Sequence, residues 1–122
     1  MAASQTKPVY GLLGRKLGHS YSPRIHAMLG DYEYRLHEVE PDDVAAFIRE
    51  GDFAGLNVTM PYKETVMDLC DKLTDAAKKI GNVNTIVRRE DGTLLGDNTD
   101  YYGFSHLLNV GHMSVTDRKV VV

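Results

Sequence analysis

A lysine, an amide and a hydroxyl occur together where a predicted strand ends, and such side chains can bind and protonate a small molecule. The stretch 55–64 opens as a short apolar run and meets Pro61, which has no N–H group for a strand ladder. A strand-to-helix junction there places Asn57, Thr59 and Lys63 at the carboxyl end of a strand, where open α/β sheets bind ligands. This set suits a small oxygen-rich substrate rather than a metal. On this stretch alone, Lys63 is more simply a solvated residue of a first helical turn.

Two serines follow the first predicted strand, which ends at Gly14. Ser22 and Pro23 are typical of a helix start, with the Ser22 hydroxyl as N-cap and proline at the first helical position. The free N–H groups of that helix end favour binding of a carboxylate by Ser20 and Ser22. The alternative is that Ser22 only caps the helix. The glycines at 11, 14 and 18 do not have the G-x-G-x-x-G spacing, so we expect no dinucleotide-binding loop here.

A further polar cluster, Asp97 to Asp100, precedes a predicted helix that runs from Tyr102 to about Val110. Thr99 or Asp100 is expected to be the N-cap of this helix. Asp100 also follows a predicted strand, as the other polar clusters do, so it belongs to the candidate site. The simpler interpretation makes Asp100 that cap and nothing more.

The remaining segments alternate between strand-like and helix-like patterns. We expect strands at 9–14, 32–39, 53–58, 82–89 and 93–96, and further helices at 22–30, 41–51, 62–70 and 74–80. Asp91-Gly92 between two β-rich runs is a strong signal for a hairpin. The sequence therefore predicts an α/β domain with a mixed, mostly parallel sheet, helices on both faces and one antiparallel hairpin.

Composition narrows the class of protein. The 122 residues fit one domain, and 43% hydrophobic with 25% charged residues is ordinary for a folded globular chain. A net charge of −3 offers no basic surface for nucleic acid or anionic lipid, so we expect neither nucleic acid nor membrane as a partner. The polar first residues do not resemble a signal peptide. A single cysteine, Cys70, excludes an internal disulfide and a multi-cysteine metal site, and we expect a cytoplasmic protein.

Four polar motifs follow successive predicted strands, and together they carry a family resemblance. They are the segments HSYSP at 19–23, NVTMPYK at 57–63, GNVNT at 81–85 and GDNTD at 96–100. In this order and spacing they resemble the N-terminal substrate-binding domain of shikimate dehydrogenase, from about Tyr10 to Phe104. That family reduces 3-dehydroshikimate to shikimate with NADPH, in the biosynthesis of aromatic amino acids. The resemblance implies a small-molecule substrate here, with NADP bound by a further domain, so this chain alone is expected to be inactive.

The resemblance also implies roles for particular residues. Lys63 and Asp100 would be the catalytic pair, because hydride arriving at a carbonyl builds negative charge that an ammonium can stabilise and protonate. The substrate would be bound by this pair together with Ser20, Ser22, Asn57, Thr59, Asn84 and Thr99. Of these, the two serines, assisted by Thr59, would hold the carboxylate, whereas Asn84 and Asp100 would bind ring hydroxyls.

Two positions depart from the usual pattern of the family. Asn82 stands where alanine is common, and Tyr101 stands where glycine commonly follows the Asn-Thr-Asp motif. Both lie beside the expected site, so a domain specific for quinate as well as shikimate, or paired with NAD, is an alternative. A second alternative is a binding module that senses shikimate-like carboxylates without catalysis. The Lys63 and Asp100 pair favours an enzyme, since a binder needs no proton-transfer pair.

The C-terminal residues predict a domain boundary. We expect residues 1–112 to form the substrate-binding domain and residues 113–122 to be a linker with the start of the first strand of an absent Rossmann domain. The run Lys119 to Val122 is typical of a buried parallel strand. An apolar strand without a neighbour favours pairing with another copy, so a homodimer is one expected partner state.

Overall fold

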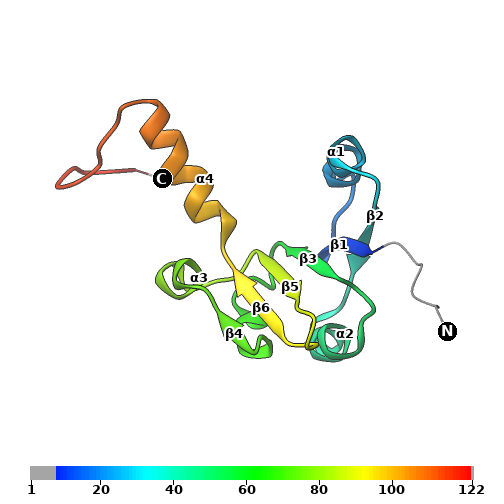
Figure 1. The fold of residues 1–122 in the computed structure, drawn as a ribbon. Helices are drawn as coiled ribbons and strands as arrows, with labels where there is room; N and C mark the ends of the chain where they lie inside the picture. The colour runs from blue at the N-terminus through cyan, green and yellow to red at the C-terminus, as the bar shows by residue number, and fades with distance from the viewer. Residues whose placement is uncertain (1–7, 122) are drawn as a thin grey trace.

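A single sheet of six strands organises residues 8–121, which are the residues that the computed structural model describes (Figure 1). The strands are β1 (Val9–Gly14), β2 (Glu33–Glu38), β3 (Gly55–Val58), β4 (Lys72–Leu73), β5 (Thr85–Arg88) and β6 (Leu94–Asp97). Their order across the sheet is β2-β1-β3-β5-β6-β4. β2 and β4 are therefore the edge strands of the described sheet.

One strand, β5, runs against the other five. β1 pairs in parallel with β2 and β3, and β4 pairs in parallel with β6, whereas β5 is antiparallel to both β3 and β6. The amino end of β5 thus lies at the same edge of the sheet as the carboxyl ends of the other strands. This arrangement confirms the predicted mixed, mostly parallel sheet with an antiparallel hairpin. The two-residue strand β4 was not predicted.

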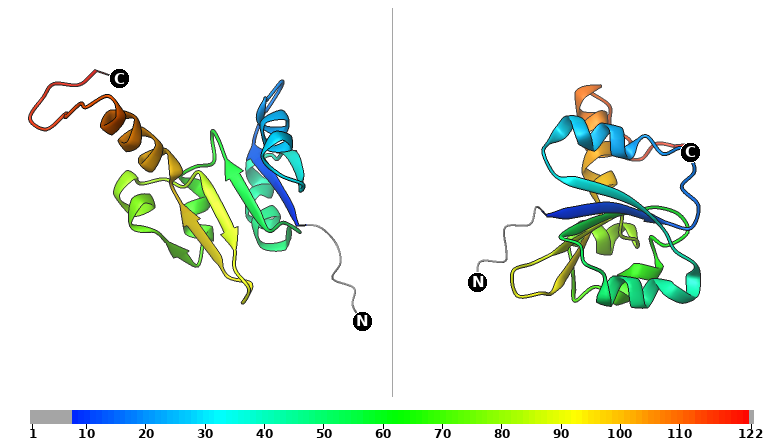
Figure 2. Two further views of the ribbon diagram at one scale, coloured as in Figure 1. Left: turned by 45° about the horizontal axis from the view of Figure 1, so that its top comes forward. Right: turned by 90° about the vertical axis from the view of Figure 1, so that its right-hand side faces the viewer.

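Helices lie on both faces of the sheet, as the sequence predicts. The α-helices are α1 (Ser22–Leu29), α2 (Val44–Glu50), α3 (Asp75–Ile80) and α4 (Thr99–Val110), with short 3-10 helices η2 (Pro41–Asp43) and η3 (Thr65–Leu69). α1 and α2 lie on opposite sides of the sheet, and α4 extends away from it (Figure 2). No helix among residues 8–121 is long and apolar enough to span a bilayer.

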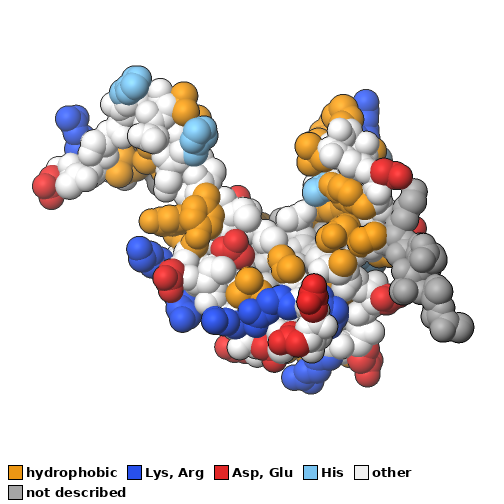
Figure 3. Space-filling view, in the orientation of Figure 1, with side chains coloured by type: hydrophobic (Ala, Val, Ile, Leu, Met, Phe, Trp, Pro, Cys, Tyr) orange, Lys and Arg blue, Asp and Glu red, His pale blue; other side chains and the backbone are white. Residues whose placement is uncertain are grey.

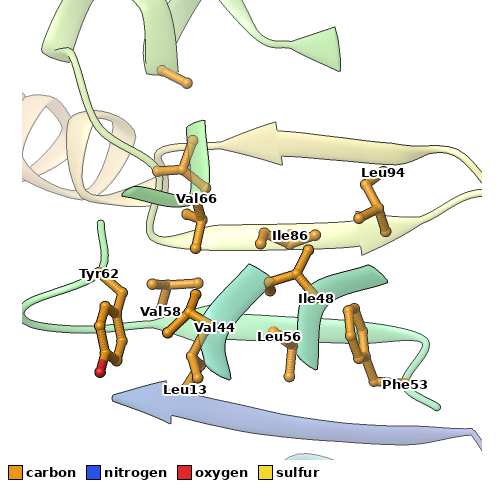
Figure 4. Packing of buried hydrophobic residues seen from close by; sticks show 12 residues of the cluster. Leu13, Val44, Ile48, Phe53, Leu56, Val58, Tyr62, Val66, Ile86 and Leu94 are labelled. Atoms are coloured by element: carbon orange, nitrogen blue, oxygen red, sulfur yellow. The ribbon is translucent and has the colours of Figure 1, made fainter. Parts of the chain in front are cut away.

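The buried core lies on the sheet face that α2 covers (Figure 4). Leu56 and Val58 of β3 and Ile86 of β5 pack with Val44 and Ile48 of α2, and each of these five is at most 3% exposed. Burying one such side chain stabilises the fold by roughly 1.5–3 kcal/mol. Because side chains alternate along a strand, the residues between them, such as Asn57, point to the opposite face. That face carries Tyr10 and Leu12 of β1 beside Asn57, and α1 lies on it.

The segment after Pro61 differs from the prediction. A cis Met60–Pro61 bond lies in a turn, and the expected helix is reduced to the 3-10 helix η3. The Lys63 carbonyl accepts the Val83 N–H at 2.8 Å, while the Met67 N–H bonds to Glu64 three residues back at 3.1 Å. A tertiary bond thus takes the carbonyl that an α-helix needs at this point. The backbone of Lys63 is instead fixed to the segment before β5.

The helix ends show where local signals were sufficient. Thr74 caps α3, as its side chain accepts the Ala77 N–H at 3.2 Å, and Gly81 closes the helix with a left-handed φ of 83°. The predicted N-caps of α1 and α4 were wrong. Ser22 is the first residue of α1, whose N-cap Tyr21 makes no side-chain cap bond. The N-cap of α4 is Asn98, neither Thr99 nor Asp100.

The C-terminal run predicted to begin a strand has no regular structure at residues 119–121, and Val122 lies outside the described residues. A strand needs a neighbour to pair with. The assignment of this run to a further domain stays a prediction.

Candidate substrate-binding site

The polar motifs meet at one edge of the sheet. β1 and β3 end there, β5 begins there, and β6 leads from there into α4. Neighbouring strands lie about 4.8 Å apart, so residues just beyond their ends are within reach of one small molecule. Figure 3 shows that the surface is hollowed between α1 and α4 at this edge.

Lys63 and Asp100 form an ion pair across the mouth of the site. Lys63 Nζ lies 3.3 Å from Asp100 Oδ2. The Lys63 side chain is 32% exposed and that of Asp100 is 69% exposed, so both are open to a ligand. A pair this solvated adds at most about 1 kcal/mol to stability. The pair therefore contributes little to stability, and it is a candidate for proton transfer at this edge of the sheet.

Asn84 organises a second polar group beside this pair. Its Nδ2 donates to Thr99 Oγ1 at 3.0 Å, and its Oδ1 accepts the Thr99 N–H at 2.8 Å. The Thr85 hydroxyl donates to the same Asn84 oxygen at 3.0 Å. These bonds tie the start of β5 to the start of α4. The sequence indicated Asn84 and Thr99 but not Thr85.

Asn57 and the two serines form a third group, joined by a tyrosine that the sequence did not single out. The Tyr34 hydroxyl donates to Asn57 Oδ1 at 2.8 Å. The Ser22 side chain also interacts with the Tyr34 phenol, and this interaction lowers the pKa of Tyr34 slightly. Ser20 Oγ accepts the Ser22 N–H at 3.2 Å. Within residues 8–121 neither serine bonds to Lys63 or Asp100, so the site consists of separate groups around one hollow.

Thr59 lies beside the loop that follows β1. Its N–H donates to the Leu13 carbonyl at 2.9 Å. A Cβ at Gly14 would lie 2.5 Å from a Leu17 methyl group and 2.8 Å from the Thr59 methyl group, so both side chains pack closely on this glycine. Thr59 is thereby placed at this edge of the sheet, and within residues 8–121 its side chain makes no hydrogen bond to the other predicted site residues.

Asn98 is a buried polar residue that was not predicted to belong to the site. Asn98 is only 1% exposed, and its side-chain Nδ2 donates a hydrogen bond to Asn82 Oδ1 at 2.6 Å. Its Oδ1 accepts the Tyr101 N–H at 3.1 Å, which caps α4. Asn82, one of the two departures from the family pattern, therefore supports the segment that carries Asp100. Asparagine is as favourable an N-cap as aspartate and better than threonine, so the sequence did carry a signal for Asn98.

An open groove of about 350 Å³ adjoins the site on the face of α1. Its lining includes Tyr10, His26, Tyr32, Tyr34, Asn57 and Thr85. The last two also belong to the polar groups above, so the groove and the site are continuous.

The arrangement supplies hydroxyl, amide, carboxylate and ammonium groups to one hollow. These groups can orient a small molecule rich in oxygen and exchange a proton with it. In the described part of the chain, no three His, Cys, Asp or Glu side chains are grouped to hold a metal ion. The fold and the site define a substrate-binding domain of the α/β class.

Comparison with known proteins gives the family. The family model for the shikimate dehydrogenase substrate binding domain matches residues 12–86, which is more than half of the chain. The chain belongs to this family, and the resemblance drawn from its four motifs is confirmed.

Relatives share both sequence and fold with the chain. The shikimate dehydrogenase (NADP(+)) of Clostridium beijerinckii is 45% identical over 121 residues, which cover 93% of this chain and 44% of that protein. The crystal structure of shikimate dehydrogenase 1 from Peptoclostridium difficile has a TM-score of 0.78 at 37% identity, covering 88% of this chain and 43% of that one. A shikimate 5-dehydrogenase from Thermus thermophilus, solved with NADP(H) and shikimate, has a TM-score of 0.76 at 30% identity, covering 88% and 44%. The chain thus spans less than half the length of these relatives.

Proposed function

We propose that this chain is the substrate-binding half of an NADP-dependent shikimate dehydrogenase, which reduces 3-dehydroshikimate to shikimate. The observation that carries the proposal is the contact between Lys63 and Asp100 at the ligand-binding edge. A domain that only bound a carboxylate would need the serines and amides but no ammonium paired with an acid. The family and the similar enzymes of comparable fold support the same substrate.

The chemistry assigned to the chain is proton transfer. NADPH would supply the hydride, and no residues of this chain form a glycine loop of dinucleotide spacing to hold it. As the carbonyl oxygen gains negative charge, the Lys63 ammonium would stabilise it and then donate a proton to it. Asp100, 3.3 Å from the ammonium, would orient it and help return a proton. General acid–base help of this kind is worth roughly 10²–10⁴-fold in rate.

The other residues of the proposed site would hold the substrate. Ser20, Ser22 and Thr59 are assigned to the carboxylate, and Asn84 and Thr99, which bond to each other at 3.0 Å, to ring hydroxyls together with Asp100. Asn57 faces the same hollow from β3.

The proposal also includes the domain limits, the cellular compartment and the oligomeric state. We assign residues 1–112 to the substrate-binding domain and residues 113–122 to a linker leading to an NADP-binding domain. A cytoplasmic setting is consistent with the single free thiol of Cys70. A homodimer is proposed only as an alternative to a monomer.

Calorimetric titration of the chain with shikimate, quinate and NADP tests the proposal. We expect shikimate to bind, NADP not to bind, and Asp100→Asn to weaken shikimate binding by roughly 10- to 100-fold, the worth of a hydrogen bond to a charged group. Asp42→Asn, at an exposed site in η2, is the matched control and should bind as the wild type does. Preference for quinate would support the broader alternative. Binding of NADP, or of none of the three, would contradict the proposal.

A further inference from the structure

Tyr34 lies on the same face of the sheet as the candidate site, although it belongs to the edge strand β2. Tyr34 pairs with Tyr10 in the register of β1 and β2, and Leu12 pairs with Asn57 in the register of β1 and β3. Paired residues share a face, as do residues two apart on one strand. Tyr34 therefore reaches over β1 toward Asn57.

The bond between them determines which atoms Asn57 can offer to a ligand. Since the Tyr34 hydroxyl donates to Asn57 Oδ1 at 2.8 Å, the oxygen of the amide faces the tyrosine. The Asn57 Nδ2 has no hydrogen-bond partner within residues 8–121, and Asn57 is half-buried beside the groove. Asn57 thus presents N–H donors to the hollow, which suit an anion and not a cation.

The Tyr34 ring is held firmly in this position. The His26 ring of α1 stacks on it with centroids 3.9 Å apart and planes at 10°. His26 Nδ1 in turn bonds to the Tyr32 hydroxyl at 2.5 Å, and Tyr32 packs edge-on against Tyr10 at 5.1 Å. These contacts leave the Tyr34 hydroxyl little freedom to turn from Asn57.

The Tyr34 phenol also stays protonated, so its hydroxyl can always donate the hydrogen bond to Asn57. Burial raises the pKa of Tyr34 to about 12, against a smaller opposing effect of the Ser22 side chain. The phenol therefore keeps its proton throughout the neutral and mildly alkaline range.

We propose that Tyr34 is a positioning residue, which fixes the Asn57 amide with its N–H groups toward the substrate carboxylate. Without the Tyr34 hydroxyl, the Asn57 amide is free to turn its oxygen toward the substrate carboxylate. The two oxygens then repel each other, and binding is weakened. This inference rests on the proposed function, because it assumes a carboxylate ligand in the hollow.

A double-mutant cycle in shikimate binding tests the inference. We expect Tyr34→Phe to weaken binding by roughly 3- to 30-fold and Asn57→Ala to weaken it by a similar or larger factor. If Tyr34 acts through Asn57, adding Tyr34→Phe to Asn57→Ala should change the affinity less than twofold. A merely structural effect of Tyr34 would instead multiply with that of Asn57.

Tyr102→Phe is the matched control, because Tyr102 is 54% exposed on α4, lies outside the groove lining and makes no hydrogen bond to the site residues described. It should bind shikimate as the wild type does. Unaltered binding by Tyr34→Phe, or fully multiplicative effects in the cycle, would overturn the inference and leave the proposed function standing. A wild-type chain that fails to bind shikimate would overturn both.

A measurement without ligand examines the positioning itself. The side-chain NH₂ signals of Asn57, assigned by their loss in Asn57→Ala, should be a single sharp pair in the ¹⁵N spectrum of the wild type. In Tyr34→Phe they should shift and broaden as the amide gains freedom, while Tyr102→Phe leaves them in place. Unchanged Asn57 signals in Tyr34→Phe would contradict the inference whatever the shikimate affinity.

Discussion

Lys63 Nζ and Asp100 Oδ2 lie 3.3 Å apart although 37 residues separate them in the sequence. Lys63 is positioned by its backbone carbonyl, which accepts the Val83 N–H, and Asp100 by the first turn of α4, which Asn98 caps. The contact thus depends on two junctions, one after β3 and one after β6. Neither junction is held by the ion pair itself.

The first prediction concerns turnover and uses a fusion of this chain to the remaining length of the Clostridium beijerinckii relative. Lys63→Met in that fusion should lower kcat for shikimate oxidation with NADP by roughly 10²–10⁴-fold, because the proton-transfer group is lost. KM for shikimate should change far less. Lys72→Met on the exposed edge strand β4 is the control, and its kcat should equal that of the unmodified fusion. Near-normal kcat for Lys63→Met would remove Lys63 from the mechanism.

The second prediction compares Gly81, whose positive φ favours glycine, with Gly103, whose helical backbone favours alanine. Gly81 has φ 83°, so Gly81→Ala should lower the free energy of unfolding by about 1 kcal/mol through backbone strain alone, since no atom lies within 4 Å of the new Cβ. Gly103 lies inside α4 with equally open space, and Gly103→Ala should raise it by about 0.5–1 kcal/mol. Urea denaturation followed by circular dichroism measures both. Equal effects of the two substitutions would contradict the backbone assignment.

The third prediction concerns the buried amide of Asn98. Asn98→Ala removes the cap of α4 and the bond to Asn82, and it should lower the free energy of unfolding by about 2–3 kcal/mol. Asn109→Ala, near the exposed end of the same helix, should change it by less than about 0.5 kcal/mol. The same urea experiment measures both, and similar values for the two variants would show that Asn98 is not structurally engaged.

The fourth prediction concerns the reactivity of Cys70. Burial, with a smaller effect of Asp71, raises the pKa of the Cys70 thiol from its usual value of 9.0 to about 11. At pH 8 the thiolate fraction should then be roughly 100-fold smaller than for an unperturbed thiol, because each pH unit changes it tenfold. Reaction with 5,5′-dithiobis(2-nitrobenzoate) should be slow and still rise with pH beyond 9. A rate that levels off near pH 9 would contradict the raised pKa.

Much of the fold could be predicted because its signals are local. Alternating and apolar runs located five of the six strands, all but β4, Asp91-Gly92 located the hairpin, and the range predicted for α3 agrees with the structure to within one residue. The helix predicted after Pro61 failed for a reason that is not local. The Lys63 carbonyl bonds to Val83, which lies 20 residues further along the chain, and no pattern near Lys63 reveals that partner.

The residues of the candidate site also divide into those that the sequence predicted and those that it did not. The residues that follow strands were found because strand ends gather at one edge, and the reversal of β5 brings Asn84 to that edge. Tyr34 was missed because its partner Asn57 is set by tertiary structure. Asn98 makes a local cap bond to the Tyr101 N–H, and only its bond to Asn82 depends on tertiary structure. The alternation of Tyr32 and Tyr34 shows that they share a face, but the bond to Asn57 appears only once β1 lies between β2 and β3.

Chemical-shift mapping of shikimate on the ¹⁵N-labelled chain tests the central claim most directly, namely that the strand ends form a substrate-binding site. Saturable shifts should be confined to the amides of residues 20–22, 57–63, 84–85 and 99–101, with Asp100→Asn reducing them at equal ligand concentration. Shifts that do not saturate, or that centre on Arg88 to Asp91 at the opposite end of β5, would contradict the account.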